Sequence, residues 1–201
     1  MERRDAKRLQ QRTQRAGFDE IKTLEDFDFT FNPAIPRATL LELGTCAWVD
    51  RRENVILVGN VGVGKSHLAQ ALGLRACRAG HSVPFTSAND MLVALRAARA
   101  DDTVERRMLN CTAPQVLIID DLGLRPLRGD EPLDLFEVIR RRYERSSTVI
   151  TSNRATDEWS PLFGDALLGS AACDRLLHHA HVVETEGASY RAKRAPKPRT
   201  A

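Results

Sequence analysis

Several features that would narrow the class of protein are missing from this sequence of 201 residues. No apolar run approaches the roughly 20 residues of a membrane-spanning helix, and the charged start does not resemble a signal peptide. The cysteines are scattered and include no C-x-x-C pair, so we expect reduced structural thiols at Cys46, Cys77, Cys111 and Cys173. No internal repeat is evident. These absences favour a cytoplasmic protein with one sizeable core and no membrane contact.

Positive charge is concentrated at the two ends of the chain. The formal net charge is +3, of which residues 1–16 carry +4 and residues 189–201 carry +5, so the remainder is −6. Such a distribution suggests a polyanionic partner, and the alternative is solvated ends without one. We therefore divide the chain into a basic N-terminal segment (1–22), a central domain (23–188) and a basic, disordered C-terminal tail (189–201).

The most informative motif is a phosphate-binding loop. Its eight residues match the pattern G-x-x-x-x-G-K-[ST] and are Gly59, Asn60, Val61, Gly62, Val63, Gly64, Lys65 and Ser66. A predicted buried strand at 54–58 precedes the loop and a helix follows it, which argues against a chance Gly-rich turn. The glycines allow backbone N–H groups to point at phosphate oxygens. In this role Lys65 reaches the β- and γ-phosphates of a nucleotide, and Ser66 is a ligand of Mg²⁺.

Strand and helix patterns alternate along the chain. Further strands are predicted at 81–86, 115–120, 147–152 and 181–184. Helices are predicted at 37–50, from the loop to about Gly80, and at 87–98, where a capping box opens the helix. Asp101 opens a short helix, Glu131 opens another, and 158–179 is predicted as short helices. This alternation predicts an α/β fold with a parallel β-sheet flanked by helices on both faces. Ligands of such sheets lie at the carboxyl ends of the strands.

Two further predictions concern packing. Phenylalanines alternate with polar residues before the first strand, so we expect residues 23–36 to pack against the surface of the core as an extended segment. The helix from Glu131 is expected to bury a face made of Leu133, Phe136, Ile139 and Tyr143.

Polar residues at predicted strand ends complete the candidate site. Asp120 ends an apolar strand and is the expected second Mg²⁺ ligand, while Asp121 is the candidate that activates the attacking water. Asn153 follows another strand and could hold that water, although Ser-Asn is also a common turn. Arg175 could stabilise transition-state charge in trans, and its spacing favours a surface ion pair with Asp174 instead.

A histidine cluster late in the chain suggests a metal site only weakly. His178, His179 and His181 lie close in sequence, but zinc sites need four ligands and no cysteine pair accompanies them. Helix termination and surface polarity are the favoured interpretation.

Together these motifs resemble the IstB-like ATP-binding proteins, which group transposition helper ATPases with DnaC-type helicase loaders in the AAA+ superfamily. The resemblance runs from about Arg15 to Arg191. The segments that carry it are 17–18, 22–29, 53–55, the phosphate loop with 67–69, 117–123, 142–144, 150–153, 174–180 and 189–191. It implies that Asn153 is the sensor residue, that Arg175 is an arginine finger supplied to a neighbouring protomer, and that His67 and Arg191 contribute to nucleotide binding.

The resemblance also implies a function. It predicts an ATPase that assembles in ATP as a ring or spiral on duplex DNA and recruits or activates a transposase. The alternative is a replicative helicase loader, which binds a helicase and single-stranded DNA. A small-molecule kinase is a third possibility, but the sequence has no arginine-rich lid.

This chain departs from the family pattern in two ways. Transposition helpers carry a further N-terminal helical segment that is not found here, and many AAA+ ATPases have glutamate where this chain has Asp121. The shorter side chain suggests slow hydrolysis.

Four arginines are candidates for contacts to DNA phosphates, and the alternative is that they form a solvated helix face. They are Arg96, Arg99, Arg106 and Arg107.

Overall fold

A single parallel sheet forms the centre of the molecule. The computed structural model describes residues 2–18 and 20–190. In chain order the strands are β1 (Asn54–Gly59), β2 (Phe85–Ser87), β3 (Val116–Leu122), β4 (Ser147–Ser152) and β5 (Ala180–Thr185). All neighbours pair in parallel, in the spatial order β2-β3-β4-β1-β5. The predicted fold class is therefore confirmed.

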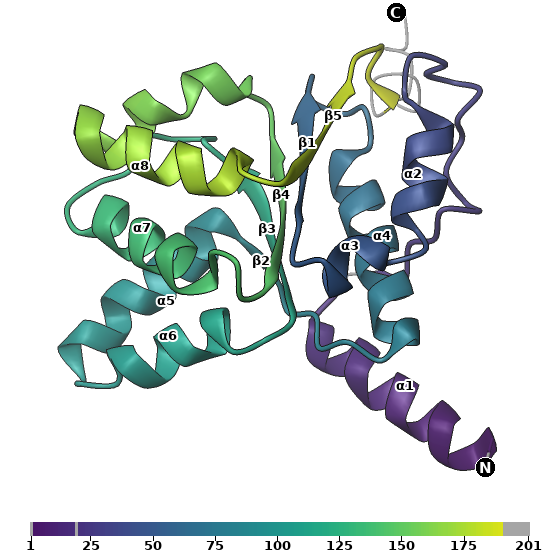
Figure 1. Ribbon diagram of the computed structural model, residues 1–201, viewed down its shortest axis with the longest axis horizontal. Helices are drawn as coiled ribbons and strands as arrows, with labels where there is room; N and C mark the ends of the chain where they lie inside the picture. Colours follow the sequence, from purple (N-terminus) through teal and green to yellow (C-terminus); the bar gives the residue numbers. More distant parts are fainter. Residues whose placement is uncertain (1, 19, 191–201) are drawn as a thin grey trace, which may run out of the picture.

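Helices cover both faces of the sheet (Figure 1). On one face lie α1 (Glu2–Ala16), α2 (Arg37–Leu43), α3 (Ala47–Asp50) and α4 (Lys65–Ala79). On the other face lie α5 (Ala88–Ala100), α6 (Val104–Thr112), α7 (Glu131–Arg142), the short 3₁₀ turns η1 (Thr156–Glu158) and η2 (Ser160–Phe163), and α8 (Ala166–Leu177).

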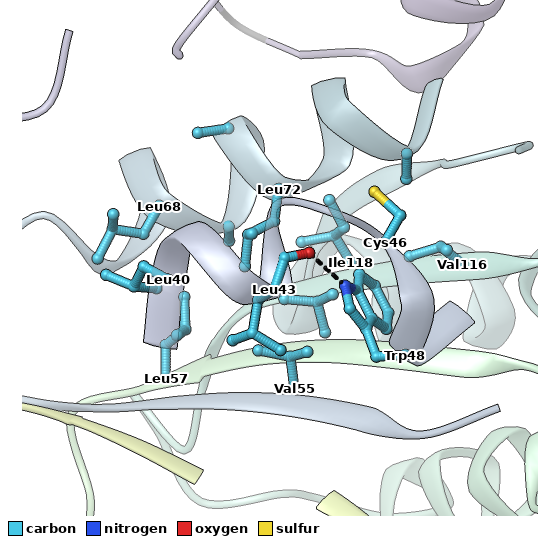
Figure 2. Close-up of a cluster of buried hydrophobic side chains, with 14 of the residues drawn as sticks. Leu40, Leu43, Cys46, Trp48, Val55, Leu57, Leu68, Leu72, Val116 and Ile118 are labelled. Carbon is cyan, nitrogen blue, oxygen red and sulfur yellow. Dashed lines mark hydrogen bonds between the residues drawn. The ribbon is translucent and has the colours of Figure 1, made fainter. Parts of the chain in front are cut away.

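The core is divided by the sheet into two clusters, and β1 contributes to both. Val55 and Leu57 pack with the α2–α4 side, whereas Ile56 and Val58 pack with the α5–α8 side. This alternation follows the two-residue repeat of a strand. Figure 2 shows the first cluster, in which the buried Trp48 ring donates its Nε1–H to the Leu43 carbonyl at 2.8 Å.

Several predicted boundaries were wrong for identifiable reasons. Residues 81–84 are not a strand, although β3 still donates hydrogen bonds to the Ser82 and Pro84 carbonyls, because proline has no N–H to continue the ladder. The predicted helix at 37–50 is broken at Gly44–Cys46, where Cys46 has a φ of 65°. Residues 23–36 pack on the core as expected, but as a series of turns instead of an extended segment.

The buried face of α7 was also partly mispredicted. Leu133 is 57% exposed, and the buried apolar residues are Leu135, Val138 and Ile139. Glu131 and Asp134 take buried positions on this helix because Arg125 and Arg99 pair with their carboxylates. Apolar spacing alone cannot identify a helix face that buries ion-paired acids.

The structure also bears on the cysteines and on membrane-spanning helices. The four cysteines are unpaired, and burial raises the pKa of each thiol. None of the helices within residues 2–18 and 20–190 is long and apolar enough to cross a membrane. The predicted disordered tail was placed at 189–201, but Tyr190 is ordered and donates a hydrogen bond to the Gly62 carbonyl; the rest of the tail, including Arg191, lies outside the described residues.

Candidate nucleotide-binding site

The phosphate loop connects β1 to α4 and depends on glycine at specific positions. Gly62 has a φ of 82° and Gly64, the N-cap of α4, has a φ of 102°. A Cβ at Gly62 would lie 2.2 Å from Ser189 Oγ, and one at Gly64 would lie 2.6 Å from Phe27 Cε2. Both the left-handed backbone and the lack of space therefore require glycine. The loop leads into the N-terminus of α4, where backbone N–H groups favour anions.

Lys65 and Ser66 occupy the first turn of α4. Lys65 is only 7% exposed, and its Nζ donates to the carbonyls of Gly59 at 2.8 Å and Asn60 at 2.7 Å. The ammonium group is thus held within the curve of the loop, where it can interact with bound phosphates. Ser66 is half-buried beside it. A lysine ammonium and a serine hydroxyl at this place are the groups that a phosphate loop needs.

The two acids at the end of β3 have different environments. Asp120 is buried and accepts a hydrogen bond from Thr151 Oγ1 on β4, while Asp121 is exposed. Thr151 Oγ1 also accepts a hydrogen bond from the Asp121 N–H at 2.9 Å. The pairing of β3 with β4 shifts by one residue here, and Asp121 has a φ of 59°. This bulge leaves one residue of β3 without a partner in the β4 ladder.

Asn153 follows β4 directly and is exposed. Because β4 lies between β3 and β1, Asn153 is at the same edge of the sheet as Asp120 and the phosphate loop. The structure therefore brings together the predicted site residues of three adjacent strands at their carboxyl ends. Thr151 was missed by sequence reasoning, because only the strand order and register place it beside Asp120.

Two segments from distant parts of the sequence contact the loop. The Tyr190 N–H donates to the Gly62 carbonyl at 2.9 Å, and the Tyr190 ring lies 5.1 Å from the Phe31 ring. His67 Nε2 lies 2.8 Å from the Thr23 carbonyl oxygen and its ring lies 5.3 Å from that of Phe27. The His67 side chain thus contacts residues of the 23–36 stretch, which leaves its backbone as the part near the loop.

Arg175 lies away from this edge. The next residue, Leu176, accepts a hydrogen bond from Asn54 Nδ2 at 2.9 Å, and Asn54 is the first residue of β1. At about 3.3 Å per residue, the six-residue β1 separates the two edges by roughly 17 Å. Arg175 therefore does not join the loop of its own chain. Among the described residues it forms no ion pair with Asp174, and its Nη1 donates to the Ala171 carbonyl at 2.7 Å instead.

The three histidines do not form one cluster. The rings of His178 and His179 are in contact at a centroid distance of 3.9 Å and are tilted by 50°, and Tyr143 OH lies 2.9 Å from His178 Nδ1. His181 instead lies 2.7 Å from Glu53 through its Nε2. Hydrogen bonds from Arg51 and from His181 lower the pKa of Glu53 to about 2.

The four candidate DNA-contacting arginines fall into two pairs. Arg96 and Arg99 extend toward acids of the α7 region, and Arg99 pairs with the buried Asp134. Arg106 and Arg107 are exposed on α6. Together with Asn110 and the small residues Ala94, Ala97 and Ala98 of α5, they line a hollow of about 320 Å³. All four arginines are exposed, and Arg106 and Arg107 form no ion pair with an acid among the described residues.

This arrangement defines a nucleotide-binding protein with the AAA+ type of P-loop fold: a parallel sheet with a phosphate loop after β1, an acid at the end of β3 and an amide after β4. Solved structures with this fold include the DnaC helicase loader, with a TM-score of 0.69 and 20% identity, covering 81% of this chain and 96% of that one. Another is AMPPCP-bound DnaA from Aquifex aeolicus, with a TM-score of 0.69 and 22% identity, covering 87% of this chain and 53% of that one.

The family follows from the sequence comparisons. The model of the IstB-like ATP-binding protein family matches residues 1–197, and this chain belongs to that family. A Pseudomonas aeruginosa protein of insertion sequence IS21, named for ATP binding, is 42% identical over 189 residues, which are 94% of this chain and 71% of that protein. An insertion-sequence protein of Mycobacterium tuberculosis, also named for ATP binding, is 40% identical over 195 residues, which are 96% and 78% of the two chains.

Proposed function

We propose that this protein is an ATP-hydrolysing helper of transposition, which assembles on duplex DNA in ATP and recruits or activates a transposase. The insertion-sequence relatives support the transposition context. The observation that carries the proposal is the division of the site between opposite edges of the sheet. The phosphate loop, Asp120 and Asn153 occupy one edge, and Arg175 is about 17 Å away, so a neighbouring protomer would have to supply this arginine.

The residues at the carboxyl edge suit phosphoryl transfer to water. Ser66 and Asp120 offer a hydroxyl and a carboxylate, the hard oxygen ligands that Mg²⁺ prefers, and the ion would neutralise phosphate charge there. Lys65 binds the β- and γ-phosphates. The exposed Asp121 orients and deprotonates the attacking water, and Asn153 holds it. Arg175 of the next protomer stabilises the charge that develops on the transferred phosphoryl group.

The DNA partner is proposed from the exposed basic groups of α6. Arg106 and Arg107 would contact backbone phosphates, which gives binding without base readout and with a steep dependence on salt. The matched test replaces both arginines by alanine and compares the result with Arg145→Ala, which removes an exposed arginine from the loop after α7. Loss of salt-sensitive duplex binding in the first variant only would support the contact, and equal binding by all three proteins would remove it.

Assembly can be tested by sedimentation and negative-stain imaging with linear duplex DNA in ATP and in ADP. The parent should form assemblies on duplex in ATP, and Lys65→Ala should not. Binding only to single strands, or only with a replicative helicase, would instead support the helicase-loader function. A parent that assembles equally well in ADP would contradict the proposed ATP switch.

A subunit-mixing experiment tests the division of the site. Arg175→Ala subunits keep an intact phosphate loop, and Asp121→Asn subunits keep Arg175 and the loop that binds ATP. Each variant alone should hydrolyse ATP slowly, and their mixture should regain activity if the arginine acts across protomers. A mixture no faster than its separate components would contradict this arrangement.

A further inference from the structure

Arg175 is held in place by more than its own helix. Its guanidinium carbon lies 5.5 Å from the centre of the Phe136 ring and 5.8 Å from the centre of the Tyr143 ring. Phe136 belongs to α7, and Tyr143 follows α7 directly. Figure 1 shows α7 and α8 packed side by side on the same face of the sheet. One ring from α7 and one from the residue after it therefore both contact the cation of α8.

The contacts leave most of the guanidinium available for a ligand. A guanidinium has five N–H donors, and Nη1 donates to the Ala171 carbonyl at 2.7 Å. Among the residues that the structure describes, Arg175 has no further hydrogen bond to the protein. The aromatic rings interact with the cation without using its donors. Arg175 is thus restrained in position while its remaining donors stay free for phosphate oxygens.

Tyr143 is itself fixed by the segment that follows Arg175. Its hydroxyl lies 2.9 Å from His178 Nδ1, and His178 is the residue directly after α8. The backbone there is anchored as well, because the Leu176 carbonyl accepts a hydrogen bond from Asn54 at the start of β1. The ring of Tyr143 and the end of α8 therefore hold each other in one arrangement.

We infer that Tyr143, together with Phe136, is a positioning residue that presents Arg175 to the nucleotide of a neighbouring protomer; this inference rests on the proposed function of Arg175. A long arginine side chain loses rotamer freedom when a phosphate fixes it, and a side chain restrained beforehand loses less. The rings reduce this cost of ordering. Tyr143 acts through Arg175 and is not expected to touch the nucleotide.

Tyr143 is the better residue to test, because Phe136 also packs against the hydrophobic core. Tyr143→Leu removes the ring from Arg175 and the hydroxyl from His178. Tyr143→Phe removes only the hydroxyl and keeps the ring. Thermal unfolding and ATP-binding measurements on each variant identify any general loss of folding or of nucleotide binding.

The decisive experiment introduces Tyr143→Leu into only one of the two subunit types of the mixture at a time. In the Asp121→Asn subunit, which donates Arg175, it should lower the ATPase rate of the mixture about three- to tenfold. In the Arg175→Ala subunit there is no guanidinium for the ring to hold, so the rate should stay within about twofold. Tyr143→Phe in the donating subunit should restore most of the lost rate.

Each outcome has a distinct meaning. Equal losses from either subunit would show that Tyr143 serves general packing and would overturn the inference, as would no loss from the donating subunit. The proposed role of Arg175 survives both of those results. If the mixture without Tyr143 substitutions regains no activity, the trans role of Arg175 fails, and the inference fails with it.

Discussion

The hydroxyl of Thr151 offers the sharpest test of how the fold builds the site. Thr151 is fully buried on β4, where its Oγ1 donates to the Asp120 carboxylate and accepts from the Asp121 N–H at 2.9 Å. Thr151→Val keeps the branched shape of the side chain and removes both hydrogen bonds. A hydrogen bond to a charged group contributes about 1.5–3 kcal/mol and a neutral one about 1 kcal/mol, so we expect a loss of about 2–4 kcal/mol.

A second buried threonine provides a matched control. Thr185 ends β5 and is also fully buried, but its Oγ1 makes a single hydrogen bond, to the neutral Val58 carbonyl at 2.8 Å. Thr185→Val should therefore cost only about 1 kcal/mol. Urea unfolding at pH 7 without nucleotide measures both variants, and equilibrium binding of Mg²⁺-ATP shows whether only Thr151→Val weakens the site.

A double-mutant cycle isolates the contact to Asp120. If Thr151 stabilises the ionised carboxylate, Thr151→Val should cost much less in an Asp120→Asn background, with a coupling energy of about 1–2 kcal/mol. Equal unfolding free energies for Thr151→Val and Thr185→Val, together with a coupling energy near zero, would refute the reasoning that this hydroxyl organises the acidic end of β3.

Three further predictions follow from local geometry. Gly64→Ala should abolish ATP binding, because its Cβ would lie 2.6 Å from Phe27. The control is Gly80→Ala, where φ is 108° but the space is open. It should lower the free energy of unfolding by about 1 kcal/mol and leave ATP affinity unchanged. Glu53 has a pKa of about 2 in the folded protein, so the stability that its ionised carboxylate contributes is present above pH 4.5 and is lost as the pH falls toward 2. The parent should therefore be more stable than Glu53→Gln by about 1 kcal/mol above pH 4.5, and this difference in unfolding free energy should fall to zero near pH 2. Arg142→Met should cost about 2–4 kcal/mol in urea unfolding, because the buried guanidinium donates to Thr148 and to the carbonyls of Cys111, Pro114 and Ser147, and a loss below 1 kcal/mol would contradict this account.

The phosphate loop and the strands were predictable because their chemistry is local. Glycines at left-handed positions, a lysine and a serine at the start of α4, and apolar runs that end in an acid each depend on neighbouring residues only. A parallel sheet then places Asp120 and Asn153 near the loop, since ligands bind where successive strands end. These features follow from short segments, whatever the rest of the chain does.

Other features depend on contacts between distant segments. The burial of Asp134 on α7 requires Arg99 of α5, and the role of Thr151 requires the register between β3 and β4. The sequence by itself predicted the phosphate loop, because its pattern is contained in one short segment. Only the tertiary structure decided that Arg175 lies at the opposite edge of the sheet, in contact with two aromatic rings, because the packing of α7 against α8 sets its position.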